Sequence, residues 1–178
     1  MIALPNYRPS QPLLPLLRTL VDITLLRTGP ESIPRSAILF ALALGLWLFS
    51  SLTVLSLIEQ YDEQDFIIGL YTALAGIVVY SALVVAAGHA ARVLPTLTAI
   101  LGCGALISLA FVVEFVLFMP FFGPTVTGIV AQLILLWSVP VEGHIIARAL
   151  DRHWYIGIVI AIGVFVLQYV IYSAMAPA

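Results

Sequence analysis

The stretch from residue 93 to residue 150 decides the fold. It reads VLPTLTAILGCGALISLAFVVEFVLFM (93–119), then PFFGP (120–124), then TVTGIVAQLILLWSVPVEGHIIARAL (125–150). A helix crosses the hydrocarbon core of a bilayer with about 20 apolar residues, and each of the two longer pieces exceeds that length. Only Glu114, Glu142 and Arg148 carry a charge here. We therefore expect two membrane-spanning helices joined by a very short turn.

The rest of the chain after residue 35 has the same character. Hydrophobic residues make up 62% of the sequence and charged residues 9%, whereas soluble domains contain about 45–50% and about 25%. We expect an all-α fold, a polytopic transmembrane bundle of five helices within residues 36–178, with no room for an additional enzyme domain. The first apolar run begins too late for a cleaved signal peptide, so we expect the first helix to be retained. The predicted spans are 36–58, 66–90, 93–119, 125–150 and 154–174.

The Arg residues predict how the bundle is oriented. The sequence contains no Lys, and its seven Arg residues precede the first span or follow the second and fourth spans: Arg8, Arg18, Arg27, Arg35, Arg92, Arg148 and Arg152. The alternate turns contain no Arg: one holds Glu59, Asp62, Glu63 and Asp65, and the other is the apolar run 118–124. Because positive residues favour the cytoplasmic side, we expect a cytoplasmic N-terminus, an external C-terminus and a location in a cell membrane, in keeping with a bacterial inner membrane.

Residues 1–35 form a cytoplasmic N-terminal segment of different composition. Between residues 11 and 27 a helix would place Leu residues along one side (Leu13, Leu16, Leu17, Leu20, Leu25). Arg18 and Asp22 are four residues apart, so they are expected to pair on the other side. This pattern predicts an amphipathic helix that lies along the cytoplasmic leaflet and ends at Thr28-Gly29-Pro30. The alternative is a lead-in without regular structure.

Three polar residues are predicted to share one depth near the outer surface. Glu114, Gln132 and Gln168 each lie about five to seven residues from the outer end of a predicted span, which is roughly 8–11 Å at the helical rise. One interpretation is a polar site that opens outward, in which Glu114 binds a proton or cation. The other is that Glu114 is protonated or reaches the surface, and that the two amides only hold helices together.

A second polar cluster is predicted near the cytoplasmic side. Pro140 leaves the carbonyl of Leu136 without its helical donor, just before Glu142. We expect Glu142 to pair with His89 or Arg92 from the second span. The cluster then serves as a structural ion pair or as a proton or ligand site; a metal site is disfavoured, because Glu142 and His144 are two residues apart and point to different sides of a helix. The predicted members are His89, Arg92, Glu142, His144 and Arg148.

Small residues one helical turn apart predict close helix packing. They occur in three spans, as the pairs Gly69 and Ala73, Gly104 and Ser108, and Gly157 and Ala161. Without bulky side chains, two helix backbones can approach each other closely within a membrane.

Signatures of catalysis and of cofactor binding are absent from the sequence. It has no Walker A loop, no His-Glu-x-x-His, no Gly-x-Ser-x-Gly and no Gly-x-Gly-x-x-Gly. Cys103 is the single cysteine, which excludes an intrachain disulfide and a cysteine-based metal site. With a net charge of −2, the chain also lacks the basic surface of a nucleic-acid-binding protein. We therefore expect a protein that is not an enzyme and has no cofactor, resident metal or nucleic-acid partner.

The layout resembles the Yip (Ypt-interacting protein) family and its bacterial relatives. The similarity rests on the lead-in LLPLL (13–17), the run GPESIP (29–34) and five closely spaced spans with very short loops. The family implies a membrane role without a defined chemistry, and its eukaryotic members act with small GTPases in trafficking. The acidic cytosolic stretch of those members is absent here.

Two functions follow from the sequence. The first is a non-enzymatic assembly, scaffold or membrane-organising subunit that docks through the interfacial helix and the cytoplasmic Arg residues. The second is a small transporter or channel subunit that uses Glu114 or Glu142 to couple protons or ions. The expected partners are the lipid bilayer and either other membrane proteins or further copies of the chain.

Overall fold

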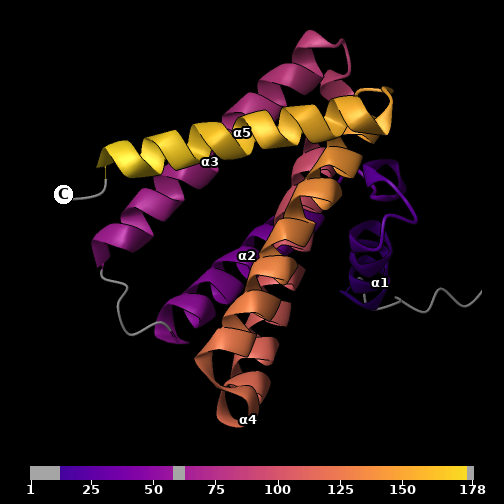
Figure 1. Ribbon diagram of the computed structural model, residues 1–178. Coiled ribbons are helices and arrows are strands. Elements are labelled where there is room, and N and C mark those ends of the chain that lie inside the picture. Colours follow the sequence, from indigo (N-terminus) through magenta and orange to yellow (C-terminus); the bar gives the residue numbers. More distant parts are fainter. Residues whose placement is uncertain (1–12, 58–62, 176–178) are drawn as a thin grey trace, which may run out of the picture.

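The computed structural model describes residues 13–57 and 63–175, and the elements within them are helical (Figure 1). Helix α1 spans Leu13–Thr24, α2 Ala37–Leu57, α3 Glu63–Ala86, α4 Val93–Ala149 and α5 Trp154–Met175, with short 3₁₀ turns at Pro30–Ser32 (η1) and Ala90–Arg92 (η2). No strand occurs in these two ranges, so the predicted all-α class is confirmed. Glu59 and Asp62 of the predicted acidic turn lie outside the described residues.

Four of these helices, α2 to α5, are long and apolar enough to cross a membrane. Their outer surfaces carry large hydrophobic side chains, such as Phe49, Val78 and Phe165, which are more than half exposed. Exposing these side chains to water would be unfavourable, whereas a helix surface that faces lipid must be apolar. A multi-pass membrane protein is the class that these helices fit.

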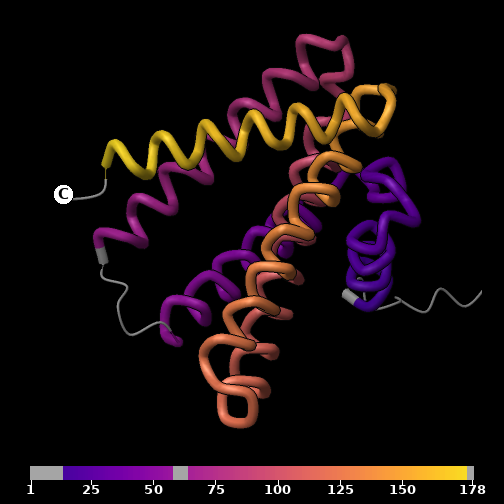
Figure 2. Tube along the Cα trace, viewed as in Figure 1, coloured from indigo at the N-terminus to yellow at the C-terminus, as the bar shows by residue number. Residues whose placement is uncertain are grey.

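Helix α4 contains two of the predicted spans. Its 57 residues are interrupted at Gly123, whose φ of 72° and ψ of 176° are not helical. Figure 2 shows that the chain reverses at this point, so that α4 is a hairpin with arms corresponding to 93–119 and 125–150. Pro120 and Pro124 flank the reversal. Pro124 opens the second arm, where Pro is tolerated because the first turn of a helix has unpaired N–H groups anyway. The five predicted crossings therefore appear as four continuous helical elements.

The second predicted span, 66–90, differs from α3 at both ends, since α3 begins at Glu63. The second span was expected to continue to Ala90, but α3 ends at Ala86. Gly88 adopts a φ of 81°, and the N–H of His89 donates back to the carbonyl of Val84 at 3.0 Å. A glycine with positive φ is a common way to end a helix. The chain then enters α4 through η2.

The helices form two layers that meet at one end. Helix α2 packs along α4, while α3 lies beside α5, and the two pairs diverge from the end that contains the α4–α5 turn (Figures 1 and 2). At that end Gly143 of α4 and Gly157 of α5 touch closely: a Cβ added to Gly143 would lie 2.8 Å from the Cα of Ile158. Gly157 and Ala161, predicted as a small-residue pair, are both buried.

Helix α1 packs against α4 through a narrower stripe than expected. Leu16, Leu20 and Ile23 are buried in one cluster with residues of both arms of α4, namely Ala99, Cys103, Ile107, Val141 and Ile145. Leu17 and Leu25 were assigned to the same side but are exposed. The predicted pairing of Arg18 with Asp22 is also replaced, because Asp22 lies 3.6 Å from Arg27. The buried stripe follows the spacing of three and four residues that faces a neighbouring helix.

The Gly123 reversal can be tested by substitution. Gly123→Ala is expected to lower the free energy of unfolding by about 1 kcal/mol, because an L-residue is strained at positive φ. Gly128→Ala is the matched control: Gly128 is helical and a Cβ there meets nothing within 4 Å, so alanine should be neutral or slightly stabilising. Thermal unfolding in detergent measures both. Equal melting temperatures for the two variants would contradict the hairpin turn.

Candidate functional site

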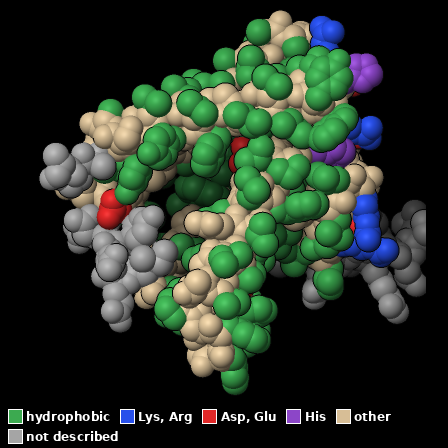
Figure 3. Space-filling view, in the orientation of Figure 1, with side chains coloured by type: hydrophobic (Ala, Val, Ile, Leu, Met, Phe, Trp, Pro, Cys, Tyr) green, Lys and Arg blue, Asp and Glu red, His purple; other side chains and the backbone are tan. Residues whose placement is uncertain are grey.

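Charged side chains gather at the end where the two layers meet (Figure 3). Arg92 bonds Asp151 at 2.7 Å and the carbonyl of Ala149 at 3.1 Å, and His89 lies 3.3 Å from Asp151. A cation beside the last carbonyls of a helix is favoured by the helix dipole. These contacts join the α3–α4 turn to the α4–α5 turn. We call this group of residues 89–92 and 148–153 the Arg-rich end.

The N-terminal segment is attached to the same end. Arg148 forms an ion pair with Glu31, and the ring nitrogen Nε2 of His144 lies 3.0 Å from the carbonyl oxygen of Thr28. Trp137 donates from its indole N–H to the carbonyl of Thr24 at 3.0 Å. The contacts to Thr24 and Thr28 pair carbonyls at the end of α1 and just after it, which lack helical partners.

The predicted inner cluster is therefore divided. His89, Arg92 and Arg148 do lie at the Arg-rich end, and His144 faces the N-terminal segment. Glu142 does not pair with His89 or Arg92, and that prediction is wrong. It points toward α3, where it accepts a hydrogen bond from the hydroxyl of Tyr80 at 2.6 Å. The second arm of α4 directs residues two apart to different sides, so Glu142 and His144 have separate partners.

The Tyr80–Glu142 hydrogen bond is the innermost polar contact between the two layers. Tyr80 is only 2% exposed, and Glu142 lies seven residues, or about 10 Å, inside the end of α4. A carboxyl group at this position is costly unless it is hydrogen-bonded. The short contact to a phenol supplies one such bond in a region of low dielectric, where it is strong.

A cavity of about 100 Å³ adjoins this contact. Gln168 of α5 reaches into its wall and donates to the carbonyl of Thr72 on α3 at 3.0 Å. A Cβ on Gly76 would lie 2.7 Å from the Gln168 amide nitrogen, so glycine makes room for that side chain. We call this space the inner cavity; its wall contains Trp47, Ala73, Gly76, Ile77, Tyr80, Ile100, Leu101, Gly104, Glu142 and Gln168.

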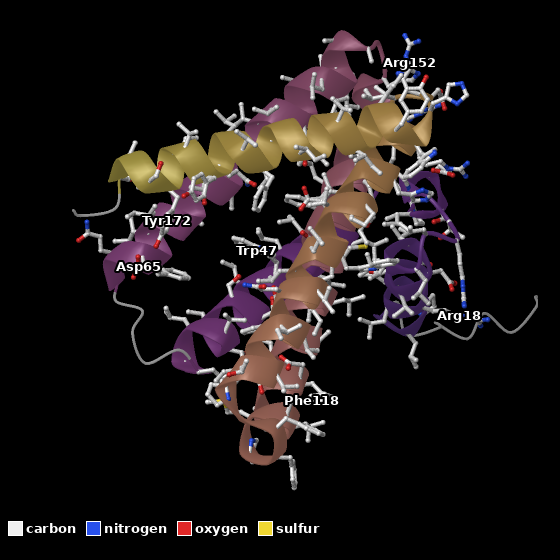
Figure 4. The ribbon with its side chains drawn as sticks, in the orientation of Figure 1. Arg18, Trp47, Asp65, Phe118, Arg152 and Tyr172 are labelled. Atoms are coloured by element: carbon white, nitrogen blue, oxygen red, sulfur yellow. The ribbon has the colours of Figure 1, made fainter. Side chains whose placement is uncertain are left out.

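A second cavity, of about 210 Å³, lies between Trp47 and the N-terminal end of α3. We call it the outer cavity; its wall contains Trp47, Ser51, Val54, Leu55, Asp65, Phe66, Gly69, Leu70 and Ser108. Figure 3 shows the molecule hollowed between the two layers, with hydrophobic side chains lining the hollow. Asp65 and Tyr172 point toward each other across α3 and α5 (Figure 4), with 3.0 Å between the carboxylate and the hydroxyl. The two cavities share Trp47 in their walls, and we refer to them together as the cleft.

The predicted outer polar site is not assembled. Glu114 is 5% exposed, and neither carboxyl oxygen has a hydrogen-bond partner, so it bonds neither amide. Gln132 is exposed on the second arm of α4. Gln168 belongs to the inner cavity, beside Glu142. Gln168 is separated from Glu114 because the α3–α5 layer diverges from the α4 hairpin, and on the hairpin itself Gln132 is exposed whereas Glu114 is buried.

Residues 13–57 and 63–175 contain neither a group of metal ligands nor a reactive thiol. No group of three His, Cys, Asp or Glu residues in these ranges has the geometry to hold a metal ion. Cys103 is buried, with its thiol 3.6 Å from the carbonyl oxygen of Leu20, where it packs as a small core residue.

The comparisons with known proteins found no relative of this chain. No protein-family model matches the chain, and neither a curated protein nor a solved structure matches it.

Sequence reasoning missed several residues of the site. Tyr80 and Asp65 of α3 and Trp47 of α2 have no distinctive spacing to Glu142, because they lie on other helices than Glu142 does. Asp151 had a usable signal, since an acidic residue in a turn flanked by Arg148 and Arg152 is placed to neutralise a neighbouring Arg.

A double-mutant cycle tests the Tyr80–Glu142 contact. Tyr80→Phe and Glu142→Met each remove one partner with little change in volume, and each should lower the free energy of unfolding by about 1–3 kcal/mol. The double variant should be less unstable than the sum, with a coupling of about 1–2 kcal/mol. Chemical unfolding in mixed micelles provides the measurement. Strict additivity would show that the two side chains do not interact.

Proposed function

We propose that this protein is a small transporter or channel subunit of the membrane, without enzymatic activity, in which Glu142 binds a proton or a cation. The observation that carries the proposal is the position of Glu142: a hydrogen-bonded carboxyl group in the wall of a cleft between two helix layers. Ionisable residues within spans commonly mark substrate and ion pathways or proton relays.

The charge of the cleft supports a positively charged substrate. The titratable side chains in the walls of its two cavities are Asp65, Tyr80 and Glu142. The Arg and His side chains of the described residues lie elsewhere, many of them at the Arg-rich end. A cleft lined by one sign of charge and by apolar walls raises the local concentration of ions of the opposite sign.

The location follows from the Arg residues. We place the Arg-rich end and the N-terminus in the cytoplasm of a bacterial cell, with the Asp65 end of the cleft facing outward. Five crossings are few for a carrier that works alone, so we infer that the protein functions as an oligomer of identical chains or together with other membrane subunits.

An assembly role is the second candidate. It is favoured by the outer face of α1, which leaves Leu14, Leu17, Val21 and Leu25 exposed after α1 has packed on α4. Such a face suits a lipid surface or a partner helix, and α1 includes the lead-in 13–17, one of the features on which the Yip resemblance rests. Fewer Arg side chains can bind a partner than the sequence indicates, because Arg92 and Arg148 already pair with Asp151 and Glu31.

Flux into liposomes tests the transport proposal. Wild-type protein should increase proton or sodium entry above that of protein-free liposomes under an imposed potential, and Glu142→Gln should abolish the increase because the amide cannot carry the charge. Glu114→Gln is the matched control, since Glu114 lies in the same helix but outside both cavities. Entry of protons and of sodium is followed with ion-sensitive dyes.

The outcomes separate the candidates. Flux that survives Glu142→Gln but disappears in Glu114→Gln would move the site to Glu114. The absence of flux in wild-type protein, together with a stoichiometric partner that is lost when residues 13–27 are deleted, would establish the assembly role instead.

A further inference from the structure

We propose that the cleft binds a small organic cation, a substituted ammonium ion with an apolar body, at Trp47. This inference rests on the proposed function and specifies its substrate class. It is carried by the composition of the two cavities, the room that glycine residues leave in them, and the aromatic side chain at their junction.

Size argues against a proton as the only occupant. The outer cavity measures about 210 Å³ and the inner cavity about 100 Å³, whereas a protonated carboxyl group needs no added space. The cavity walls also contain glycine where a larger residue would fit: a Cβ on Gly69 would meet nothing within 4 Å. Space of this kind beside a few polar groups is typical of small-molecule sites.

The ligands in the walls argue against a bare metal ion. Hard divalent cations take six or more oxygen ligands, and the inner cavity offers the side-chain oxygens of Tyr80, Glu142 and Gln168 only. The outer cavity adds Ser51, Ser108 and Asp65, but most of its wall is apolar. A substituted ammonium ion carries alkyl groups around its charged nitrogen, so it does not need a complete set of oxygen ligands.

Trp47 supplies the interaction that such an ion uses. Its side chain contributes to the wall of both cavities, and Gly104 lies beside it, since a Cβ added there would be in ordinary contact with the ring at 3.7 Å. The face of an indole attracts alkylammonium groups, by about 2 kcal/mol when both are removed from water. Figure 4 shows Trp47 between the end marked by Asp65 and the interior of the molecule.

The two carboxylates have different places along the cleft. Asp65 lies near the start of α3 and Tyr80, the partner of Glu142, fifteen residues further on, which is about 22 Å along the helix. One small ion cannot contact both at once. Asp65 therefore attracts the cation at the outer mouth, and Glu142 stabilises it at the inner end, with Trp47 between them.

Titration calorimetry of the purified full-length protein with benzyltrimethylammonium tests the inference. We expect saturable binding, and no comparable binding of benzyl alcohol, a neutral aromatic probe. Trp47→Leu should weaken binding about ten-fold through loss of the cation–aromatic contact, whereas Trp154→Leu, which changes an exposed tryptophan outside the cleft, should bind as wild type does.

Filling the cleft provides a second, independent variant. Gly69→Leu should prevent binding by occupying the outer cavity, while Gly163→Leu on α5 adds the same side chain at a helical site with open space outside both cavities. Both variants should elute and melt like the wild type. Equal affinity for benzyl alcohol, or wild-type binding in Gly69→Leu, would overturn the inference.

Flux distinguishes this inference from the function on which it rests. Proton or sodium flux that depends on Glu142, without binding of benzyltrimethylammonium, would overturn the organic-cation site and leave the transport proposal in place. Binding that is blocked by Gly69→Leu, without flux of any cation, would support the site and contradict transport.

Discussion

The contact of Gly143 with Gly157 is the constraint on which the rest of the structure depends. With no side chain on either residue, α4 and α5 touch backbone to backbone beside the Arg-rich end, and a Cβ on Gly157 would lie 2.8 Å from that of Ala147. In a membrane, where water exclusion does not drive helices together, such close packing is a main source of association. From this crossing α5 diverges from α4 and pairs with α3 instead, and the divergence opens the cleft.

The polar contacts follow from that geometry. Two ion pairs, Arg92–Asp151 and Arg148–Glu31, lie at the Arg-rich end. They connect the N-terminal segment, the α3–α4 turn and the α4–α5 turn. Further along, Tyr80 donates to Glu142 and Gln168 donates to the carbonyl of Thr72, so these three side chains each have a partner on another helix. Buried polar groups that are satisfied in this way fix one arrangement of helices, because any shift would leave them unpaired in a medium of low dielectric.

The sequence predicted the positions of the helices along the chain better than it predicted which residues contact one another. Hydropathy located the four long apolar helices, and α5 agrees with its predicted span within one residue, because the length of an apolar run is a local property. Which residues meet is not local. Depth alone suggested that Glu114, Gln132 and Gln168 converge, but crossing angles are set by small residues such as Gly157, and a change in angle separates residues of equal depth. The same argument explains why Glu142 was assigned to His89 or Arg92 instead of Tyr80.

The central claim is that water and cations enter a cleft between the helix layers, and thiol labelling tests it most directly. In a Cys103→Ala background, Ser51→Cys and Ser108→Cys place thiols in the wall of the outer cavity, and Phe165→Cys places one on the lipid-facing side of α5. Only an ionised thiol in water reacts rapidly with a charged methanethiosulfonate reagent. The account predicts rapid labelling of both cavity positions and none at residue 165 in a bilayer; cavity positions as unreactive as residue 165 would contradict it.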